Sequence, residues 1–259
     1  MGSVSKDAIA LITGGESGIG AACAVALAKA DSAVAILYWK DRDAAEGVRA
    51  AAEAAGARAI TLQGDVGDEA SVTTAFAAVT AALGVPTILI NSAGLNMRGV
   101  AVADMELAQW DMMIRTDLTG AFLTSRALVR GLRGTGQAGR IVNISSIHGQ
   151  AVRAGGADYC SAKAGLENLT RTMAIECASM GITVNAIAPG MILTPMNQRA
   201  QTDAAYRASL ERNIPAGRAG QPEEVGAMAV YLCSPDAAYV TGVVLPIDGG
   251  LSLEAGLGA

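Results

Sequence analysis

Two polar side chains in the middle of the chain have the types and the spacing that proton transfer requires. Tyr159 and Lys163 are four residues apart, so on a helix they lie on one face. A lysine ammonium beside a phenol favours the phenolate by charge attraction, and a tyrosine so placed can act as both acid and base. An isolated Tyr-x-x-x-Lys pair is usually a surface helix pair, so this interpretation depends on the rest of the chain.

A glycine-rich turn near the start of the chain has the composition of a phosphate-binding site. Residues 13–20 read Thr-Gly-Gly-Glu-Ser-Gly-Ile-Gly, after an apolar run and before a helical pattern. Glycines let a backbone approach a pyrophosphate, and the amino terminus of a helix offers free N–H groups. The spacing Gly-x-x-x-Gly-x-Gly differs from the GxGxxG of longer Rossmann dehydrogenases. A simple tight turn is the alternative, but the position after a first strand favours a nucleotide site.

The elements that would position these groups alternate between strand and helix. Most of the expected strands are continuously apolar, as in a parallel sheet covered on both faces; they are Ala8–Thr13, Ala33–Leu37, Arg58–Gln63, Thr87–Asn91, Arg140–Ile144, Thr183–Ala188 and Val243–Ile247. Helical patterns between them include Ile19–Ala30, Asp43–Ala55, Glu69–Leu83 and Ala157–Met180. This predicts one α/β domain over residues 1–259, a doubly wound Rossmann-type fold with a seven-stranded parallel sheet. Residues 191–219 show no strand and predict a lid or substrate loop.

Composition excludes several classes of function. Hydrophobic residues make up 51% of the chain and charged residues 17%, which is enough to build a large core. The net charge is −5 without a basic block, so neither nucleic acid nor a membrane surface is an expected partner. No apolar run spans a bilayer, no signal peptide is visible, and no cysteines form a CxxC pair. We expect a cytoplasmic protein with free thiols, a small-molecule substrate and no metal.

Five motifs, in order, resemble those of the classical short-chain dehydrogenase/reductase family. They are Thr13–Gly20, Asp65-Val66, Asn91-Ser92-Ala93-Gly94, Tyr159-x-x-x-Lys163 and Pro189-Gly190. The resemblance covers about Ile9 to Gly250 and implies an NAD(P)-dependent oxidoreductase. Its cofactor half would be about residues 1–145, and its catalytic and substrate half about 146–259. It implies cofactor contacts from Thr13, Gly14, Ser17, Gly18, Ile19, Gly20, Tyr38, Trp39, Lys40, Asp65, Val66, Asn91, Ala93, Gly94, Tyr159, Lys163, Pro189, Gly190, Ile192 and Thr194.

The resemblance also assigns the catalytic roles. Ser146 matches the family's serine, which hydrogen-bonds the substrate oxygen, while Tyr159 transfers the proton and Lys163 also holds the nicotinamide ribose. One position departs from the pattern, because Asp117 stands where the family usually has an asparagine that holds a helix kink and a proton-relay water. An ionised aspartate cannot donate the amide hydrogen bond and can instead pair with Lys163. We therefore expect Asp117→Asn to preserve or raise turnover, unless the aspartate has become part of the relay.

The preference for NAD or NADP depends on the residues at the end of the second strand. An acid there binds the ribose hydroxyls of NAD, whereas basic residues accept the 2′-phosphate of NADP. The family's acidic position is Tyr38 here, and Lys40 and Arg42 follow it. NADP is therefore favoured slightly, although Asp41 could serve a ribose and Lys40 and Arg42 could simply be solvated.

Several segments are similar to those of glucose 1-dehydrogenases, namely Asp117–Leu123, Ser145–His148 and Thr194–Asn197. An aldose oxidised at its anomeric carbon is therefore the first expectation, with His148 facing a sugar hydroxyl or serving only as a loop residue. Reduction of a ketone or a 3-oxoacyl-carrier-protein thioester is second, and a non-enzymatic cofactor-binding subunit is a distant third. The resemblance further implies a homotetramer formed through two long helices, Leu107–Leu132 and Ala157–Met180.

Overall fold

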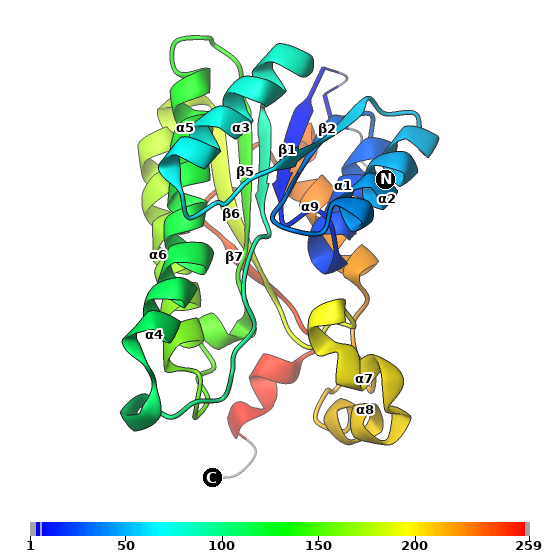
Figure 1. The fold of residues 1–259 in the computed structure, drawn as a ribbon, viewed down its shortest axis with the longest axis vertical. Coiled ribbons are helices and arrows are strands. Elements are labelled where there is room, and N and C mark those ends of the chain that lie inside the picture. The colour runs from blue at the N-terminus through cyan, green and yellow to red at the C-terminus, as the bar shows by residue number, and fades with distance from the viewer. Residues whose placement is uncertain (1–3, 6, 257–259) are drawn as a thin grey trace.

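The computed structural model describes residues 4, 5 and 7–256 and contains a seven-stranded, wholly parallel sheet (Figure 1). The strand order is β3-β2-β1-β4-β5-β6-β7. The strands are β1 (Ile9–Thr13), β2 (Ala33–Tyr38), β3 (Ala59–Gln63), β4 (Ile88–Asn91), β5 (Gly139–Ile144), β6 (Ile182–Pro189) and β7 (Val244–Ile247). The predicted fold is confirmed, and the predicted strand ends differ from these by at most one residue.

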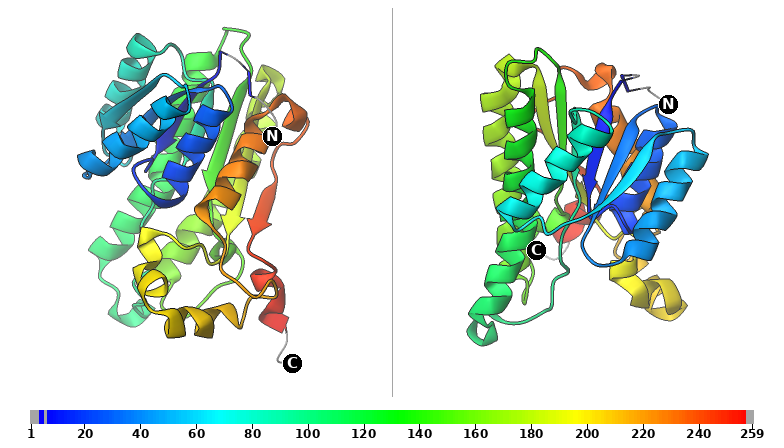
Figure 2. Two further views of the ribbon diagram at one scale, coloured as in Figure 1. Left: turned by 90° about the vertical axis from the view of Figure 1, so that its right-hand side faces the viewer. Right: turned by 45° about the horizontal axis from the view of Figure 1, so that its top comes forward.

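Helices cover both faces of the sheet, as Figures 1 and 2 show. On one face lie α1 (Gly18–Lys29), α2 (Arg42–Ala54) and α9 (Pro222–Cys233). On the other lie α3 (Glu69–Ala82), α5 (Gly120–Leu132) and α6 (Ala157–Cys177), with α4 (Leu107–Ile114) below them. Each face has its own apolar cluster, so β1, β2, β4 and β5 are buried on both sides. This double burial is the reason that β1, β2 and β4 read as mainly apolar runs.

The predicted long helix over residues 107–132 is present but not uniform. Between α4 and α5 the chain adopts a π-helical segment, Arg115–Thr119, which contains Asp117. Such a segment adds a residue to a helical turn and is found frequently at functional sites.

The segment expected to form a lid contains two short helices, α7 (Gln198–Thr202) and α8 (Ala204–Glu211). They lie beyond the carboxyl ends of the strands (Figure 1). Strand order reverses between β1 and β4, so the loops after these strands diverge and leave a crevice, the usual ligand site of an open α/β sheet. Within residues 4, 5 and 7–256, no helix has the length and apolar character needed to cross a membrane.

Candidate active site

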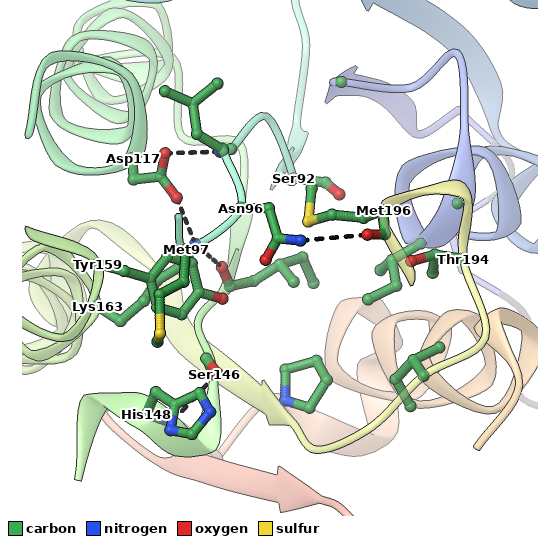
Figure 3. Close-up of a pocket in the computed structure, with 18 of the residues that line it drawn as sticks. Ser92, Asn96, Met97, Asp117, Ser146, His148, Tyr159, Lys163, Thr194 and Met196 are labelled. Carbon is green, nitrogen blue, oxygen red and sulfur yellow. Dashed lines mark hydrogen bonds and ion pairs between the residues drawn. The ribbon is translucent and has the colours of Figure 1, made fainter. Parts of the chain in front are cut away.

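A cavity of about 1290 Å³ opens at the carboxyl ends of the strands. Its lining runs from the glycine-rich turn after β1, past the loops after β4 and β5, to the loop after β6. Figure 3 shows Tyr159, Lys163, Ser146 and His148 gathered at one part of this cavity and Thr194 across from them. The structure therefore brings the predicted catalytic groups into one space with the predicted phosphate-binding turn.

Helix α6 presents Tyr159 and Lys163 on one face, as their spacing predicts. The Lys163 ammonium lies 5.5 Å from the centre of the Tyr159 ring. Its Nζ donates a hydrogen bond to the carbonyl oxygen of Ile144, at the end of β5, over 3.1 Å. The lysine side chain is only 7% exposed. A buried ammonium this close to a phenol is held where its charge acts on the hydroxyl.

Asp117 approaches Lys163 from the π-helical segment. One carboxylate oxygen, Oδ1, accepts a hydrogen bond from the Leu95 N–H at 2.8 Å, and the other, Oδ2, lies 3.1 Å from Lys163 Nζ. Burial raises the pKa of Asp117, whereas the Lys163 ammonium and the Leu95 N–H lower it. The effect of burial is larger, so the net shift is upward. Burial lowers the pKa of Lys163, but the charges of Asp117 and Tyr159 raise it further, so the net shift is upward and the lysine stays charged. The aspartate thus both pairs with Lys163 and holds the loop after β4 at Leu95.

Ser146 and His148 lie on a tight turn after β5. The Ser146 hydroxyl accepts a hydrogen bond from the His148 N–H at 3.2 Å, and His148 Nδ1 lies 2.7 Å from the carbonyl oxygen of Ala151. The His148 ring meets the Tyr159 ring edge-on, with centroids 6.3 Å apart. The turn therefore places both predicted substrate-binding side chains beside Tyr159.

A buried carboxylate that the sequence analysis did not single out fixes this turn to α6. Glu167, one helical turn after Lys163, is 2% exposed. Its oxygens accept hydrogen bonds from Ser145 Oγ at 3.2 Å and from Gln150 Nε2 at 3.0 Å. A Cβ at Gly149 would collide with this carboxylate. The turn that carries Ser146 is thus held at both of its ends.

Beneath the site, a buried polar network joins the central strands to the helices. Asn91 Nδ2 donates to Asn143 Oδ1 at 2.8 Å, and Asn143 Nδ2 donates to Thr170 Oγ1 at 2.8 Å. Thr124 Oγ1 donates to Asn91 Oδ1 at 2.6 Å, and Asn91 also reaches Ser125 Oγ at 3.0 Å. Buried amides need such partners, and here the partners link β4, β5, α5 and α6. The side chain of Asn91, a residue predicted to contact the cofactor, lies in this network, and Asn91 is not among the residues that line the cavity.

The glycine-rich turn fits a dinucleotide pyrophosphate. Gly14 adopts φ +59°, and a Cβ there would lie 2.8 Å from the Cα of Ala93. A Cβ at Gly20 would overlap the carbonyl oxygen of Gly14, so only glycine lets α1 begin this close to β1. Thr13 Oγ1 accepts hydrogen bonds from the N–H groups of Ser92 and Ala93, both at 3.1 Å. Thr13 and Gly20 therefore shape the cradle without lining the cavity.

At the far end of the cavity, two predicted cofactor residues already have partners. Asp65 Oδ2 pairs with Arg115 at 2.9 Å, and its Oδ1 accepts from the Gly67 N–H at 2.8 Å. Lys40 Nζ lies 3.7 Å above the Trp39 ring and does not line the cavity. The predicted residues that line the cavity are Gly14, Ser17, Gly18, Ile19, Tyr38, Trp39, Asp65, Val66, Ala93, Gly94, Asp117, Ser146, His148, Tyr159, Lys163, Pro189, Gly190, Ile192 and Thr194. Among the described residues, no group of histidine, cysteine, aspartate or glutamate side chains is arranged for a metal.

Comparison with known proteins identifies the family. Residues 14–252 match a family model described as enoyl-(acyl carrier protein) reductase. The cis-4-hydroxycyclohexanecarboxylate dehydrogenase of Sinomonas cyclohexanicum is 39% identical over 253 residues, which cover 96% of this chain and 98% of that protein. A short-chain dehydrogenase/reductase structure from Serratia marcescens superimposes with a TM-score of 0.87 at 32% identity, covering 95% of this chain and 98% of the other. The chain belongs to the classical short-chain dehydrogenase/reductase family.

Membership of the short-chain dehydrogenase/reductase family makes the chain an NAD(P)-dependent oxidoreductase, which leaves the non-enzymatic alternative without support. A further family structure, from Agrobacterium tumefaciens and provisionally named a 2-deoxy-D-gluconate 3-dehydrogenase, contains bound NADP. It has a TM-score of 0.86 at 34% identity and covers 94% of this chain and 96% of that one. The identification rests on the whole chain rather than on one motif.

Proposed function

We propose that this enzyme transfers a hydride between NADP or NAD and the carbinol or carbonyl carbon of a small substrate, with Tyr159 as the acid and base. The observation that carries the proposal is the shared cavity of the Ser146, Tyr159 and Lys163 side chains with the glycine-rich turn. A hydride donor and a proton donor must face the same carbon–oxygen bond, and this arrangement allows it.

The chain's own residues supply the proton chemistry and the positioning. The Ser146 hydroxyl donates a hydrogen bond to the substrate oxygen, and the Tyr159 hydroxyl gives a proton to that oxygen in reduction or takes one in oxidation. Lys163 stabilises the negative charge on the Tyr159 oxygen and donates to the ribose hydroxyls. When bound, the nicotinamide supplies or accepts the hydride. Gly14, Gly18 and the start of α1 hold the pyrophosphate.

An aldose oxidised at its anomeric carbon is the first proposed substrate. The carbonyl oxygen of Ala151 can only accept, so His148 Nδ1 carries the hydrogen of their 2.7 Å contact. In the neutral imidazole, His148 Nε2 is then an acceptor without a hydrogen-bond partner among the described residues, and it lies on the ring that faces Tyr159. A sugar hydroxyl next to the reacting carbon could donate to it.

A ring-borne secondary alcohol or its ketone is the second proposed substrate. The relatives from Sinomonas and Agrobacterium are named for oxidation at a secondary carbinol. Met97, Met191 and Met196 line the cavity and offer flexible apolar contacts to a ring. Both candidates use the same proton and hydride transfer and differ only in what surrounds the reacting carbon.

A homotetramer in the cytoplasm is the proposed state of the protein. Apolar side chains stand exposed on the two long helical segments, with Leu107 71% exposed on α4, Phe122 41% on α5 and Ile175 82% on α6. Helix pairing between copies would bury them. All four cysteines are buried free thiols, which suits a reducing compartment. Light scattering of the purified protein tests the tetramer.

The decisive experiment measures reduced nicotinamide by absorbance, with a panel of aldoses and a panel of cyclic ketones and alcohols. Turnover that is abolished in Tyr159→Phe while cofactor affinity persists supports the mechanism, because a positioned acid and base contributes on the order of 10²–10⁴ in rate. A Tyr159→Phe variant that retains more than half of the activity would overturn it.

A further inference from the structure

Glu16 occupies a place in the cofactor cavity that the family motif does not specify. It is one of the x positions in the Gly-x-x-x-Gly-x-Gly spacing, and it lines the cavity together with Tyr38 and Trp39 at the end of β2. The turn is tied to this strand end by a hydrogen bond from the Gly15 N–H to the Leu37 carbonyl at 3.3 Å. Glu16 Oε1 is 3.5 Å from the Trp39 backbone nitrogen. The carboxylate therefore lies between the phosphate-binding turn and the second strand.

The second carboxylate oxygen of Glu16 has no donor. Oε2 is buried and has no hydrogen-bond partner among the described residues, and Glu16 forms no salt bridge with them. A buried polar atom left without a partner is uncommon in a native structure, since burial without a hydrogen bond costs free energy. Because Glu16 is among the residues that line the cavity, a bound molecule that brings a hydroxyl donor to its carboxylate would satisfy it.

The adenosine ribose brings such donors to this location. In open α/β dinucleotide folds, the ribose next to the adenine lies at the end of the second strand, where an acid accepts hydrogen bonds from its hydroxyls. In this chain the strand ends in Tyr38, which cannot serve as that acid. Glu16 supplies a carboxylate to the same location from the neighbouring turn.

We infer that Glu16 is the residue that binds the adenosine ribose diol and that it makes this enzyme prefer NAD to NADP. This inference rests on the proposed cofactor function and reverses the slight preference for NADP that the basic residues of the β2 loop suggest. A 2′-phosphate would replace one hydroxyl donor with negative charge beside the carboxylate, and a carboxylate repels that charge.

The neighbouring charges do not offset Glu16. Lys40, the cation that favours NADP, rests over the Trp39 ring at 3.7 Å and does not line the cavity. Asp41, an acid of the loop after β2, caps α2 by accepting from the Ala44 N–H at 3.0 Å. Asp41 also lies outside the cavity lining. Arg42, the basic residue that begins α2, is not in the lining either, so Glu16 is the one residue of these four that lines the cavity.

The test is calorimetric titration of NAD⁺ and NADP⁺ into the purified protein without substrate, for the wild type, Glu16→Gln and the matched control Asp41→Asn. Glutamine keeps the size of the side chain and removes its charge. The wild type should bind NAD⁺ more tightly than NADP⁺. Glu16→Gln should weaken NAD⁺ binding about tenfold, as expected when a charged hydrogen bond becomes neutral. The same variant should tighten NADP⁺ binding, while Asp41→Asn should leave the ratio of the two dissociation constants unchanged.

Three results would overturn the inference: tighter NADP⁺ binding by the wild type, an unchanged ratio in Glu16→Gln, or a ratio that shifts in Asp41→Asn instead. Binding of neither nucleotide would overturn the proposed cofactor function itself. If Glu16→Gln does not fold, the wild type still decides the matter in a salt series. Repulsion between Glu16 and a 2′-phosphate predicts that the advantage of NAD⁺ shrinks as salt rises, whereas a cationic phosphate pocket predicts that it grows.

Discussion

Thr170→Val should destabilise the enzyme, because it removes one hydroxyl from the polar network beneath the active site. Valine keeps the branched shape of threonine, so packing is conserved. Asn143 Nδ2 loses its acceptor at 2.8 Å, and both side chains are fully buried. Thr170 also gives up its own 2.8 Å hydrogen bond to the Leu166 carbonyl, one turn earlier in α6.

The expected loss follows from the unsatisfied amide. A buried donor left without a partner costs about 1–3 kcal/mol. In a domain of this size each kcal/mol lowers the melting temperature by roughly 2–4 °C, so the variant should melt about 2–12 °C below the wild type. The matched control is Thr74→Val on α3, because Thr74 makes the same backward bond, to the Ala70 carbonyl at 2.9 Å, but is exposed. This control should change the melting temperature by no more than about 2 °C.

The assay is thermal unfolding at fixed protein concentration, extended to a double-mutant cycle with Asn143→Leu. In the Asn143→Leu background the amide is absent, so adding Thr170→Val should lower the free energy of unfolding by less than about 0.5 kcal/mol. Equal shifts in Thr170→Val and the exposed control, or costs that simply add in the double variant, would refute the account of the network.

Three further substitutions test the site. Lys163→Ala should weaken cofactor binding and slow turnover together, because in the proposed mechanism one ammonium serves both the ribose and the tyrosine; unchanged nicotinamide affinity would show that Lys163 points elsewhere. Asp117→Asn should preserve or raise turnover near neutral pH, but its activity should fall off at a lower alkaline pH than in the wild type. The reason is that Asp117 raises the pKa of Lys163 while burial lowers it, so removing the carboxylate lowers that pKa; a clear loss of rate at neutral pH in the pH–rate profile would make Asp117 a working part of the relay. Tyr38→Asp should reduce NADP use relative to NAD by adding negative charge at the end of β2, and steady-state kinetics with both cofactors that showed no change in the ratio would place the phosphate pocket elsewhere.

The fold could be predicted because its signals are local. β1, β2 and β4 are buried along their whole length, and that burial leaves mainly apolar runs in the sequence. Tyr159 and Lys163 could be paired for the same reason, since four residues make one helical turn. The proposed pairing of Asp117 with Lys163 matches a 3.1 Å contact in the structure.

What the sequence could not predict depends on contacts between distant residues. Asp65 pairs with Arg115, which lies fifty positions later in the chain. Glu16 meets Trp39 only because β1 and β2 are neighbours in the sheet, with Thr13 beside Leu37. Glu167 looks like an ordinary surface glutamate until the turn after β5 folds onto α6. Lys40 has the charge for a phosphate, but its position over Trp39 is visible only in three dimensions.

The orientation of Asp117 in the site depends on the exact number of residues in the π-helical segment. In a regular α-helix each residue advances the side-chain direction by about 100°, so one additional residue rotates everything after it relative to everything before it. Arg115–Thr119 uses that additional residue to turn Asp117 toward Lys163 while α5 still packs against β4 and β5. Deleting one residue from this segment would let the helix run straight and would set its two ends out of phase. Either Asp117 would then point away from Lys163, or the buried face of α5 would turn away from the sheet. The number of residues in this segment therefore fixes the orientation of the site relative to the core.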